Sequence, residues 1–275
     1  MKITLPLLLS LSTLVLAHPL AETDSETTTK IETPASVPEI NTEHLANTAD
    51  FFSSDAAAAA VITTENGLST DACKPVIMIF ARGTNEDGNV GTIAGPPLFT
   101  DLRAALTTAK ISVQGVAYSA NVFGYLAGGD TEGSKTLASL TNQASTKCPS
   151  AKLVLGGYSQ GAQLVHNAAK TLSAAVSAKI AAVIVFGDPD NGQAVGSVPS
   201  SKVLSICHAQ DIICTKRGGF TTREFWVFSF SIPALLGGAA WRGEKKLLTA
   251  VLIDLTYGID AATASAFIVK AVGSV

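Results

Sequence analysis

The sequence predicts an α/β fold, a three-layer sandwich whose central sheet is mostly parallel. One observation predicts this class, and a second predicts that a single domain is formed. From Cys73 onward, short apolar runs alternate with stretches of helical spacing, the order in which strands and covering helices follow one another. The chain has 275 residues, 47% hydrophobic and 15% charged, which is enough for one well-buried domain with some chain left over.

Each element follows from a local pattern of side chains. Apolar runs predict five strands, at residues 75–80, 111–116, 152–157, 181–187 and 202–207. Helical spacing of apolar residues predicts helices at residues 97–109, 133–145, 161–172 and 260–272. A strand, a helix and the next strand in succession form a crossover, so we expect parallel pairing with helices on both faces of the sheet.

The N-terminal quarter of the chain has a different composition. Residues 1–17 carry Lys2, then an apolar stretch, and end at Ala17, which is typical of a secretory signal peptide. The run is shorter than the roughly 20 residues that a membrane span needs. Residues 18–72 hold ten acidic residues, one lysine and many threonines, so we expect a disordered acidic arm. The folded domain is then expected at residues 73–275.

Cysteine number and charge narrow the class further. Secretion favours disulfides for all four cysteines. Cys207 and Cys214 are seven residues apart and would close a small loop, which leaves Cys73 for Cys148. From residue 73 there are 17 basic and 12 acidic residues, an excess too small and scattered for a nucleic-acid partner. We expect a secreted, extracellular monomer without a stable membrane span.

The pentapeptide Gly157-Tyr158-Ser159-Gln160-Gly161 fits the pattern G-x-S-x-G. A predicted strand precedes it and a predicted helix follows, which is the context in which such a serine becomes an exposed nucleophile. The first amides of the helix would point to the place where negative charge develops. Ser159 is therefore a candidate for covalent catalysis.

Three separated motifs give the chain a resemblance to a known family. GYSQGAQ (157–163), FARGTNEDGNVGTIAGPP (80–97) and CHAQDIIC (207–214) together resemble the fungal cutinase family of small secreted α/β-hydrolases. The likeness covers roughly residues 73–215 and resumes at LTYGIDAATASAFI (255–268).

The resemblance implies roles for particular residues. Ser159 would be the nucleophile and Asp211 the acid of a catalytic triad, while Gln160 N–H and Thr84 would form the oxyanion hole. It also implies an α/β-hydrolase-like sandwich without a large lid, no metal and no cofactor, and an apolar ester such as cutin, or another ester polymer or lipid-like compound, as substrate. An acetylxylan esterase, which resembles the same family, is the alternative enzyme.

The triad histidine is missing. In the family it directly precedes a stretch like Leu-Thr-Tyr-Gly, but here Asp254 stands at that place, 40 residues after Cys214. The usual carboxylate pKa of Asp254 makes it a weak base. His208 would be an improvised base at best, and His166 reads as a packing or helix-surface residue about two turns from Ser159.

Residues 223–254 interrupt the alternating pattern and hold both tryptophans of the chain. We interpret them as a translated intron. The codons CGT-GAG-TTY for residues 223–225 contain a splice donor, and ATA-GAY for residues 253–254 contains an acceptor. Excision removes 31 codons, or 93 nucleotides, and joins C to AY, which encodes histidine nine positions after Cys214. Two alternatives are a membrane helix over residues 225–241 and a genuine insert in a catalytically dead, polymer-binding relative.

Overall fold

The structure is a computed structural model, and it describes residues 60–215 and 256–275. The signal peptide, the acidic arm up to residue 59 and the segment 223–254 with Asp254 lie outside the described residues. The expected absence of a large lid also depends in part on residues 216–255, which are outside them as well.

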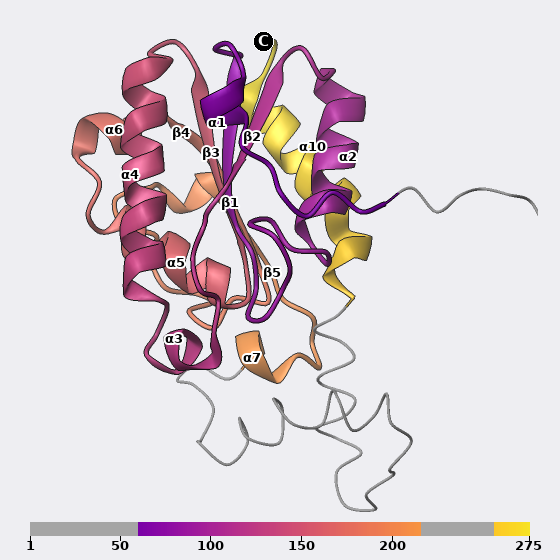
Figure 1. The fold of residues 1–275 in the computed structure, drawn as a ribbon, viewed down its shortest axis with the longest axis vertical. Coiled ribbons are helices and arrows are strands. Elements are labelled where there is room, and N and C mark those ends of the chain that lie inside the picture. The colour runs from indigo at the N-terminus through magenta and orange to yellow at the C-terminus, as the bar shows by residue number, and fades with distance from the viewer. Residues whose placement is uncertain (1–59, 216–255) are drawn as a thin grey trace, which may run out of the picture. The chain divides into compact units, whose positions relative to one another are not determined.

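A five-stranded parallel sheet forms the centre of the domain (Figure 1). Its order is β2-β1-β3-β4-β5, and every neighbouring pair runs parallel. All five strands were predicted, with small changes at their ends: β1 Val76–Ala81, β2 Ile111–Gly115, β3 Lys152–Tyr158, β4 Ile180–Phe186 and β5 Val203–Ile206.

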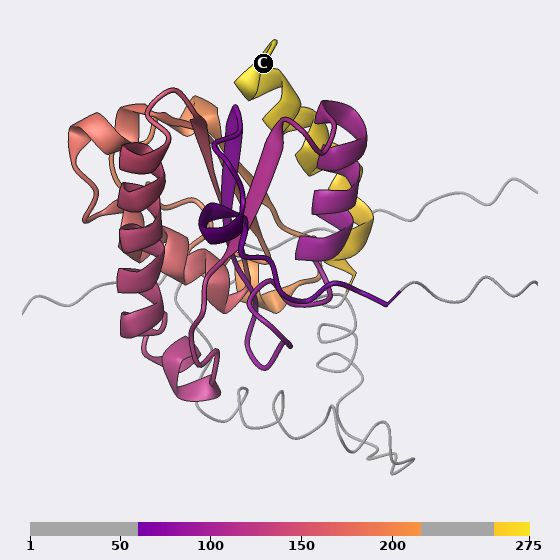
Figure 2. The same ribbon diagram turned by 45° about the horizontal axis from the view of Figure 1, so that its top comes forward.

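Helices cover both faces of the sheet, as Figures 1 and 2 show. The four predicted helices are present as α2 (Gly95–Leu106), α4 (Thr131–Lys147), α5 (Gln160–Ala169) and α10 (Ala261–Val272). In both views α2 and α10 lie on one side of the sheet, and α4 and α5 on the other. The three-layer α/β prediction is therefore confirmed.

Short helical turns complete the described chain, and the sequence pattern did not predict them. A single turn carries too few apolar positions to show a period. These turns are α1 Gly67–Thr70, α3 Val122–Leu126, α6 Ala174–Ala178, η2 Ser200–Lys202, α7 Ile212–Thr215 and η3 Tyr257–Asp260.

Strand β1 shows how the sheet divides the hydrophobic core in two. Successive side chains of a strand point to opposite faces. Ile77 and Ile79 join the cluster beneath α4 and α5, whereas Met78 and Phe80 join the cluster beneath α2 and α10. Strands covered on both faces read as continuous apolar runs, which is why the sequence showed runs here and no alternation.

The domain begins before the boundary that the sequence predicted at residue 73. Glu65 forms an ion pair with Arg103 of α2 at 2.8 Å, and Leu68 of α1 is buried in the core. Ser112 of β2 donates a hydrogen bond to Asp71 at 2.9 Å. The expectation of disorder up to residue 72 is wrong for residues 60–72, because these local contacts outweigh the polar composition of the segment.

Both expected disulfides are present. Cys73 joins Cys148 across 75 positions, and Cys207 joins Cys214 across seven. The first bond ties the start of the sheet to the end of α4, and the second closes the loop that follows β5.

Candidate active site

Ser159 stands between the end of β3 and the start of α5 in a strained conformation. Its φ is 52° and its ψ is −117°, a region that side-chain-bearing residues rarely occupy. Such strain costs of order 1–3 kcal/mol and persists only where the surroundings impose it. Here Ser159 N–H donates to Phe186 O at 2.9 Å, and Ser159 O accepts from Ala162 N at 2.9 Å.

The two glycines of the pentapeptide are required by close packing of backbone. A Cβ on Gly157 would lie 2.4 Å from Gly161 O, and a Cβ on Gly161 would lie 2.0 Å from Ala81 O. Real Cβ atoms do not approach this closely. The absence of side chains thus lets α5 begin directly against β1 and β3, with Ser159 at the bend.

Gln160 orients the hydroxyl of Thr84. Its side-chain nitrogen Nε2 donates one hydrogen to Asn121 O at 2.8 Å, which fixes which way the amide faces. The second hydrogen goes to Thr84 Oγ1, also at 2.8 Å. Because Thr84 Oγ1 accepts this bond, its own hydrogen is left for another acceptor. The backbone N–H of Gln160 belongs to the first turn of α5, where amides have no intrahelical acceptor.

A carboxylate holds the turn that carries Thr84. Glu86 Oε2 accepts from Gly83 N at 2.6 Å, and its Oε1 accepts from Thr92 N and Ile93 N at 2.8 and 2.9 Å. Three amide donors on one carboxylate make a rigid turn, since each bond is charge-assisted. The sequence reading missed Glu86, although it lies inside the quoted motif 80–97.

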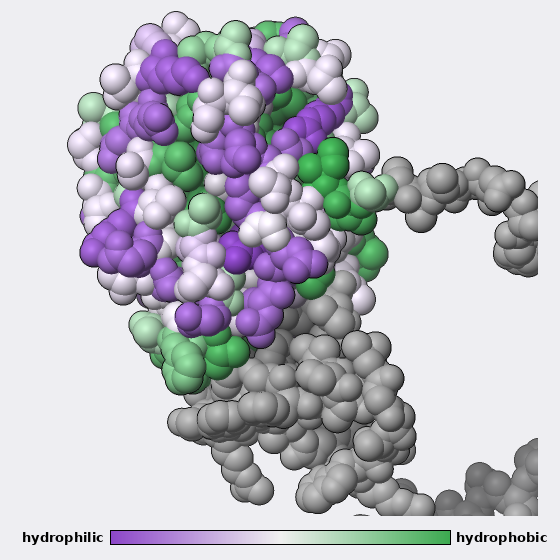
Figure 3. All heavy atoms as spheres, viewed as in Figure 1, coloured by the Kyte–Doolittle hydropathy of each residue, from purple (hydrophilic) through white to green (hydrophobic). Residues whose placement is uncertain are grey.

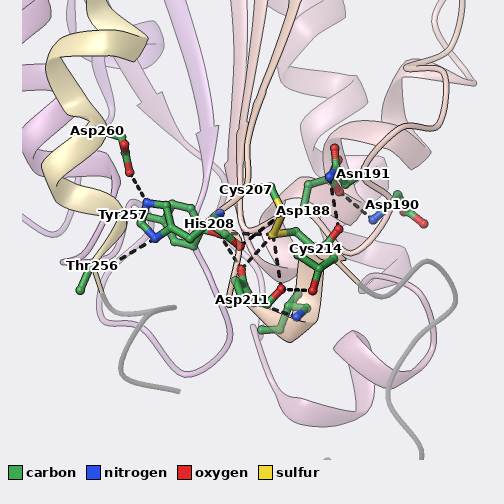
Figure 4. The surroundings of a disulfide bond; sticks show 12 residues. Asp188, Asp190, Asn191, Cys207, His208, Asp211, Cys214, Thr256, Tyr257 and Asp260 are labelled. Atoms are coloured by element: carbon green, nitrogen blue, oxygen red, sulfur yellow. Dashed lines mark hydrogen bonds and ion pairs between the residues drawn. A yellow bond between two sulfur atoms is a disulfide. The ribbon is translucent and has the colours of Figure 1, made fainter. Parts of the chain in front are cut away.

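Asp211 is fully buried inside the disulfide loop (Figure 4). Its Oδ1 accepts from Ile213 N at 2.7 Å, and its Oδ2 accepts from the Tyr257 hydroxyl at 2.6 Å. Burial raises the pKa of Asp211, and the bonds from Tyr257 and Ile213 oppose that rise without cancelling it. Tyr257 thereby links the loop of Asp211 to the segment that leads into α10.

The ring of His208 is engaged by residues of the segment that leads into α10. Figure 4 shows its ring beside Tyr257, on which it stacks with centroids 4.2 Å apart. Nε2 lies 2.7 Å from Asp260 Oδ2, and Nδ1 lies 3.3 Å from Thr256 Oγ1. Both ring nitrogens are thus engaged, which argues against the improvised base considered from the sequence.

His166 is buried within the fold, with an exposed fraction of 1%. Its Nε2 lies 2.9 Å from Asp188 Oδ2. The packing alternative is therefore the correct one, and the helix-surface alternative is wrong. The sequence analysis did not single out Asp188. Its position two residues after the apolar strand β4, at the carboxyl end of the sheet, could have indicated a functional or structural carboxylate.

The candidate residues collect at one edge of the sheet. Thr84, Ser159, Asp188 and Asp211 follow β1, β3, β4 and β5 in turn, and in a parallel sheet the carboxyl ends of the strands share an edge. A strained serine at that edge, between strand and helix and followed by Gln160, whose side chain orients the Thr84 hydroxyl, is typical of α/β-hydrolase-type serine hydrolases.

Comparisons with known proteins identify the family within that class. The family model described as Cutinase matches residues 72–229, and the chain belongs to the cutinase family. It is 56% identical to a cutinase of Blumeria hordei over 181 residues, which are 64% of this chain and 75% of that one. It is 43% identical to a cutinase of Botryotinia fuckeliana over 202 residues, 74% of this chain and 85% of that one.

The structural comparison agrees. A cutinase of Trichoderma reesei, solved in complex with a C11Y4 phosphonate inhibitor, matches with a TM-score of 0.62 at 35% identity. The match covers 85% of this chain and 87% of that one. Within the described part of the chain, no helix combines the length and the apolar character that crossing a membrane requires.

Proposed function

We propose that the gene specifies a secreted serine esterase that hydrolyses cutin or another apolar carboxylic ester through an acyl-enzyme. Ser159 attacks the ester carbonyl, and the hydroxyl of Thr84 and the N–H of Gln160 stabilise the oxyanion. Asp211 orients a histidine, and water then hydrolyses the acyl-enzyme. The observation that carries the proposal is the strained Ser159 between β3 and α5, followed by Gln160, whose side chain bonds Thr84 Oγ1 and leaves the hydrogen of that hydroxyl to donate.

The chain as printed lacks the base that this mechanism needs. Of its four histidines, His208 is engaged by Asp260 and Thr256, and His166 is buried against Asp188. His18 and His44 lie outside the described residues. Loss of a triad member leaves only about 10³- to 10⁴-fold catalysis over water, so we expect severely reduced turnover from this polypeptide.

Excision of the segment behind residues 223–254 would restore the base. The joined chain has histidine directly before Leu255-Thr256-Tyr257, nine positions after Cys214. The residues that follow the new histidine already reach the triad acid, because the Tyr257 hydroxyl donates to Asp211 Oδ2 at 2.6 Å. A histidine three positions before Tyr257 is within about 11 Å of it along the chain, at 3.8 Å per residue.

The position at which the family model stops matching the chain also supports the splicing proposal. The family model ends at residue 229, inside the interrupting segment, although α10 covers the same sheet as the rest of the domain. Genomic and transcript sequences across codons 223–254 test the splicing proposal directly. Codons that lack the donor, the acceptor or the C and AY halves of the new codon would reject it.

Activity is tested on two proteins, the chain as printed and the chain with residues 223–254 replaced by histidine. We expect fluorophosphonate labelling at Ser159 and hydrolysis of p-nitrophenyl butyrate to rise at least a hundredfold in the second protein. Reaction with such a probe is suggested by the phosphonate bound to the Trichoderma reesei cutinase. Ser159→Ala in the second protein is the matched control, and equal rates in the two unmutated proteins would reject the proposal.

The same assay separates the two alternatives. An acetylxylan esterase would prefer acetyl over butyryl esters, whereas the proposed enzyme prefers the longer chain. A catalytically dead relative, which the missing histidine favours, would adhere to an ester polymer and gain no hydrolysis when histidine is restored. Secretion is tested by recovering the protein from culture medium with residues 1–17 removed.

A further inference from the structure

A buried ion pair is formed by two residues that are not among the proposed catalytic residues, His166 and Asp188. His166 is on α5, seven residues after Ser159, and Asp188 follows the end of β4. Their Nε2 and Oδ2 atoms are 2.9 Å apart, and each side chain is only 2% exposed. Nothing in the proposed reaction uses either group, so the cost of burying them needs another reason.

The surroundings of the ring favour its charged form. The ring nitrogen that does not contact Asp188, Nδ1, lies 3.3 Å from a second hydrogen-bond acceptor, Ala194 O. A carboxylate and a carbonyl oxygen both accept, so only a ring that is protonated on both nitrogens satisfies both. Burial lowers the pKa of His166, but Asp188, with a smaller contribution from the charge of Asp190, raises it above its ordinary value. Among the residues that the structure describes, Asp188 and Asp190 are the charged groups that act on this ring.

Asp188 also builds the turn that follows β4. Its second oxygen, Oδ1, accepts from Asp190 N at 2.9 Å, and its carbonyl accepts from Asn191 N at 3.1 Å. A side chain that bonds the backbone two residues later is the usual device for fixing such a turn. The turn is thus anchored to α5 through His166.

The turn at residues 188–191 also contacts the disulfide loop that contains Asp211. Asn191 Nδ2 donates to Cys214 O at 3.2 Å, and Figure 4 shows Asp188, Asp190 and Asn191 beside the disulfide. The geometry points to His166 as a positioning residue that acts through Asp188 and Asn191 to hold the Asp211 loop in place relative to α5. This inference rests on the proposed catalytic roles of Ser159 and Asp211.

The link is tested in the full chain by hydrogen exchange. Asn191→Ala removes the bond to Cys214 O, and we expect the protection factors of amides in residues 207–215 to fall about fivefold, the size of one hydrogen bond. Gln193→Ala is the matched control, because the side chain of Gln193 donates to Asp190 Oδ1 within its own loop. Equal protection in the two variants would overturn the link.

The charge state is tested by nuclear magnetic resonance of the imidazole nitrogens. We expect His166 to be protonated on both nitrogens at pH 7 and to become neutral there in Asp188→Asn, which keeps the shape of the side chain. A neutral His166 at pH 7 in the unmutated chain would overturn the ion pair.

The catalytic consequence is measured in the protein with restored histidine. Asn191→Ala should lower kcat about fivefold with KM unchanged, and Gln193→Ala should change neither. An unchanged kcat in Asn191→Ala would overturn the positioning role. If the restored protein has no esterase activity at all, the proposed function fails. Hydrogen exchange of the Asp188→Asn variant, compared with Asn191→Ala, still decides whether the His166–Asp188 pair holds the loop, and equal protection of residues 207–215 in Asp188→Asn and the unmutated chain would overturn it.

Discussion

At the scale of single residues, the environment of Asp211 combines burial with two strong donors. The Tyr257 hydroxyl donates to Asp211 Oδ2 and also accepts from His208 N at 3.1 Å, so it joins two parts of the disulfide loop. A buried carboxylate that loses a donor suffers more than an exposed one, because water cannot replace the bond.

Tyr257→Phe should therefore destabilise the protein by about 1–3 kcal/mol. The bond from Tyr257 lowers the pKa of Asp211, so its loss costs more when the carboxylate is ionised than when it is protonated. We expect a larger drop in the free energy of unfolding at pH 7 than near pH 4, measured by urea denaturation. A drop that is equal at both pH values would contradict the contact.

Asp211→Asn tests the effect that opposes the hydrogen bond from Tyr257, namely the cost of burying the charged carboxylate. The pKa of Asp211 is raised by burial, so its contribution to stability is fully present below the ordinary value of 3.8 and is lost as pH rises through the folded value. Asparagine cannot ionise, so the stability of the variant relative to the unmutated chain should rise as the pH rises from 4 to 8. Thermal unfolding across that range measures it, and a difference in Tm that stays the same at every pH would contradict the prediction.

At the scale of elements, the junction of α5 with the sheet depends on glycine. Gly161 lies in the first turn of α5, where alanine would ordinarily improve helix stability by about 1 kcal/mol over glycine. Its Cβ would meet Ala81 O at 2.0 Å, however, and backbone of a central strand cannot give way. The steric clash outweighs the gain in helix propensity, because relieving it would require α5 to move away from β1, and both elements pack into the same core.

Gly161→Ala should cost about 2–3 kcal/mol of stability, the size of overpacking in a tight core. It should also displace α5 from β1 and so reduce fluorophosphonate labelling of Ser159 in the restored protein. Gly128→Ala is the control: its φ is +83°, but nothing lies within 4 Å of the added Cβ. We expect that variant to lose about 1 kcal/mol and to keep its labelling, and an equal loss in both would contradict the packing argument.

At the scale of the whole molecule, the sequence predicted the sheet and the long helices because those signals are periodic and local. The pentapeptide between a strand and a helix predicted Ser159, whereas Thr84 was predicted, together with the role of Gln160, through the resemblance to the cutinase family. The sequence could not predict the partners of Asp188 or Tyr257, since His166 and Asp211 lie 22 and 46 residues away from them along the chain. Such pairings follow from the topology of the sheet and not from any local spacing.

The boundary at residue 73 failed for a related reason. Composition is averaged over a window, and the window 18–72 is dominated by acidic and threonine residues. A few residues near the end of that window belong to the folded domain because of individual contacts, such as the burial of Leu68 in the core and the ion pair of Glu65 with Arg103. An average over composition cannot detect such individual contacts.

The two disulfides should divide stability and site organisation between them. In the chain-entropy treatment, a loop closed over 75 positions stabilises by about 4.5 kcal/mol and one closed over seven by about 2.4 kcal/mol. Replacing Cys73 and Cys148 by serine should lower Tm more than replacing Cys207 and Cys214.

Only the Cys207–Cys214 disulfide encloses Asp211, so only its loss should raise hydrogen exchange in residues 207–215 at temperatures well below unfolding. In the restored protein the first double variant should keep kcat while folded, and the second should lose most of it. A second variant that keeps kcat would show that the loop holds Asp211 through Asn191 and Tyr257 without help from the disulfide.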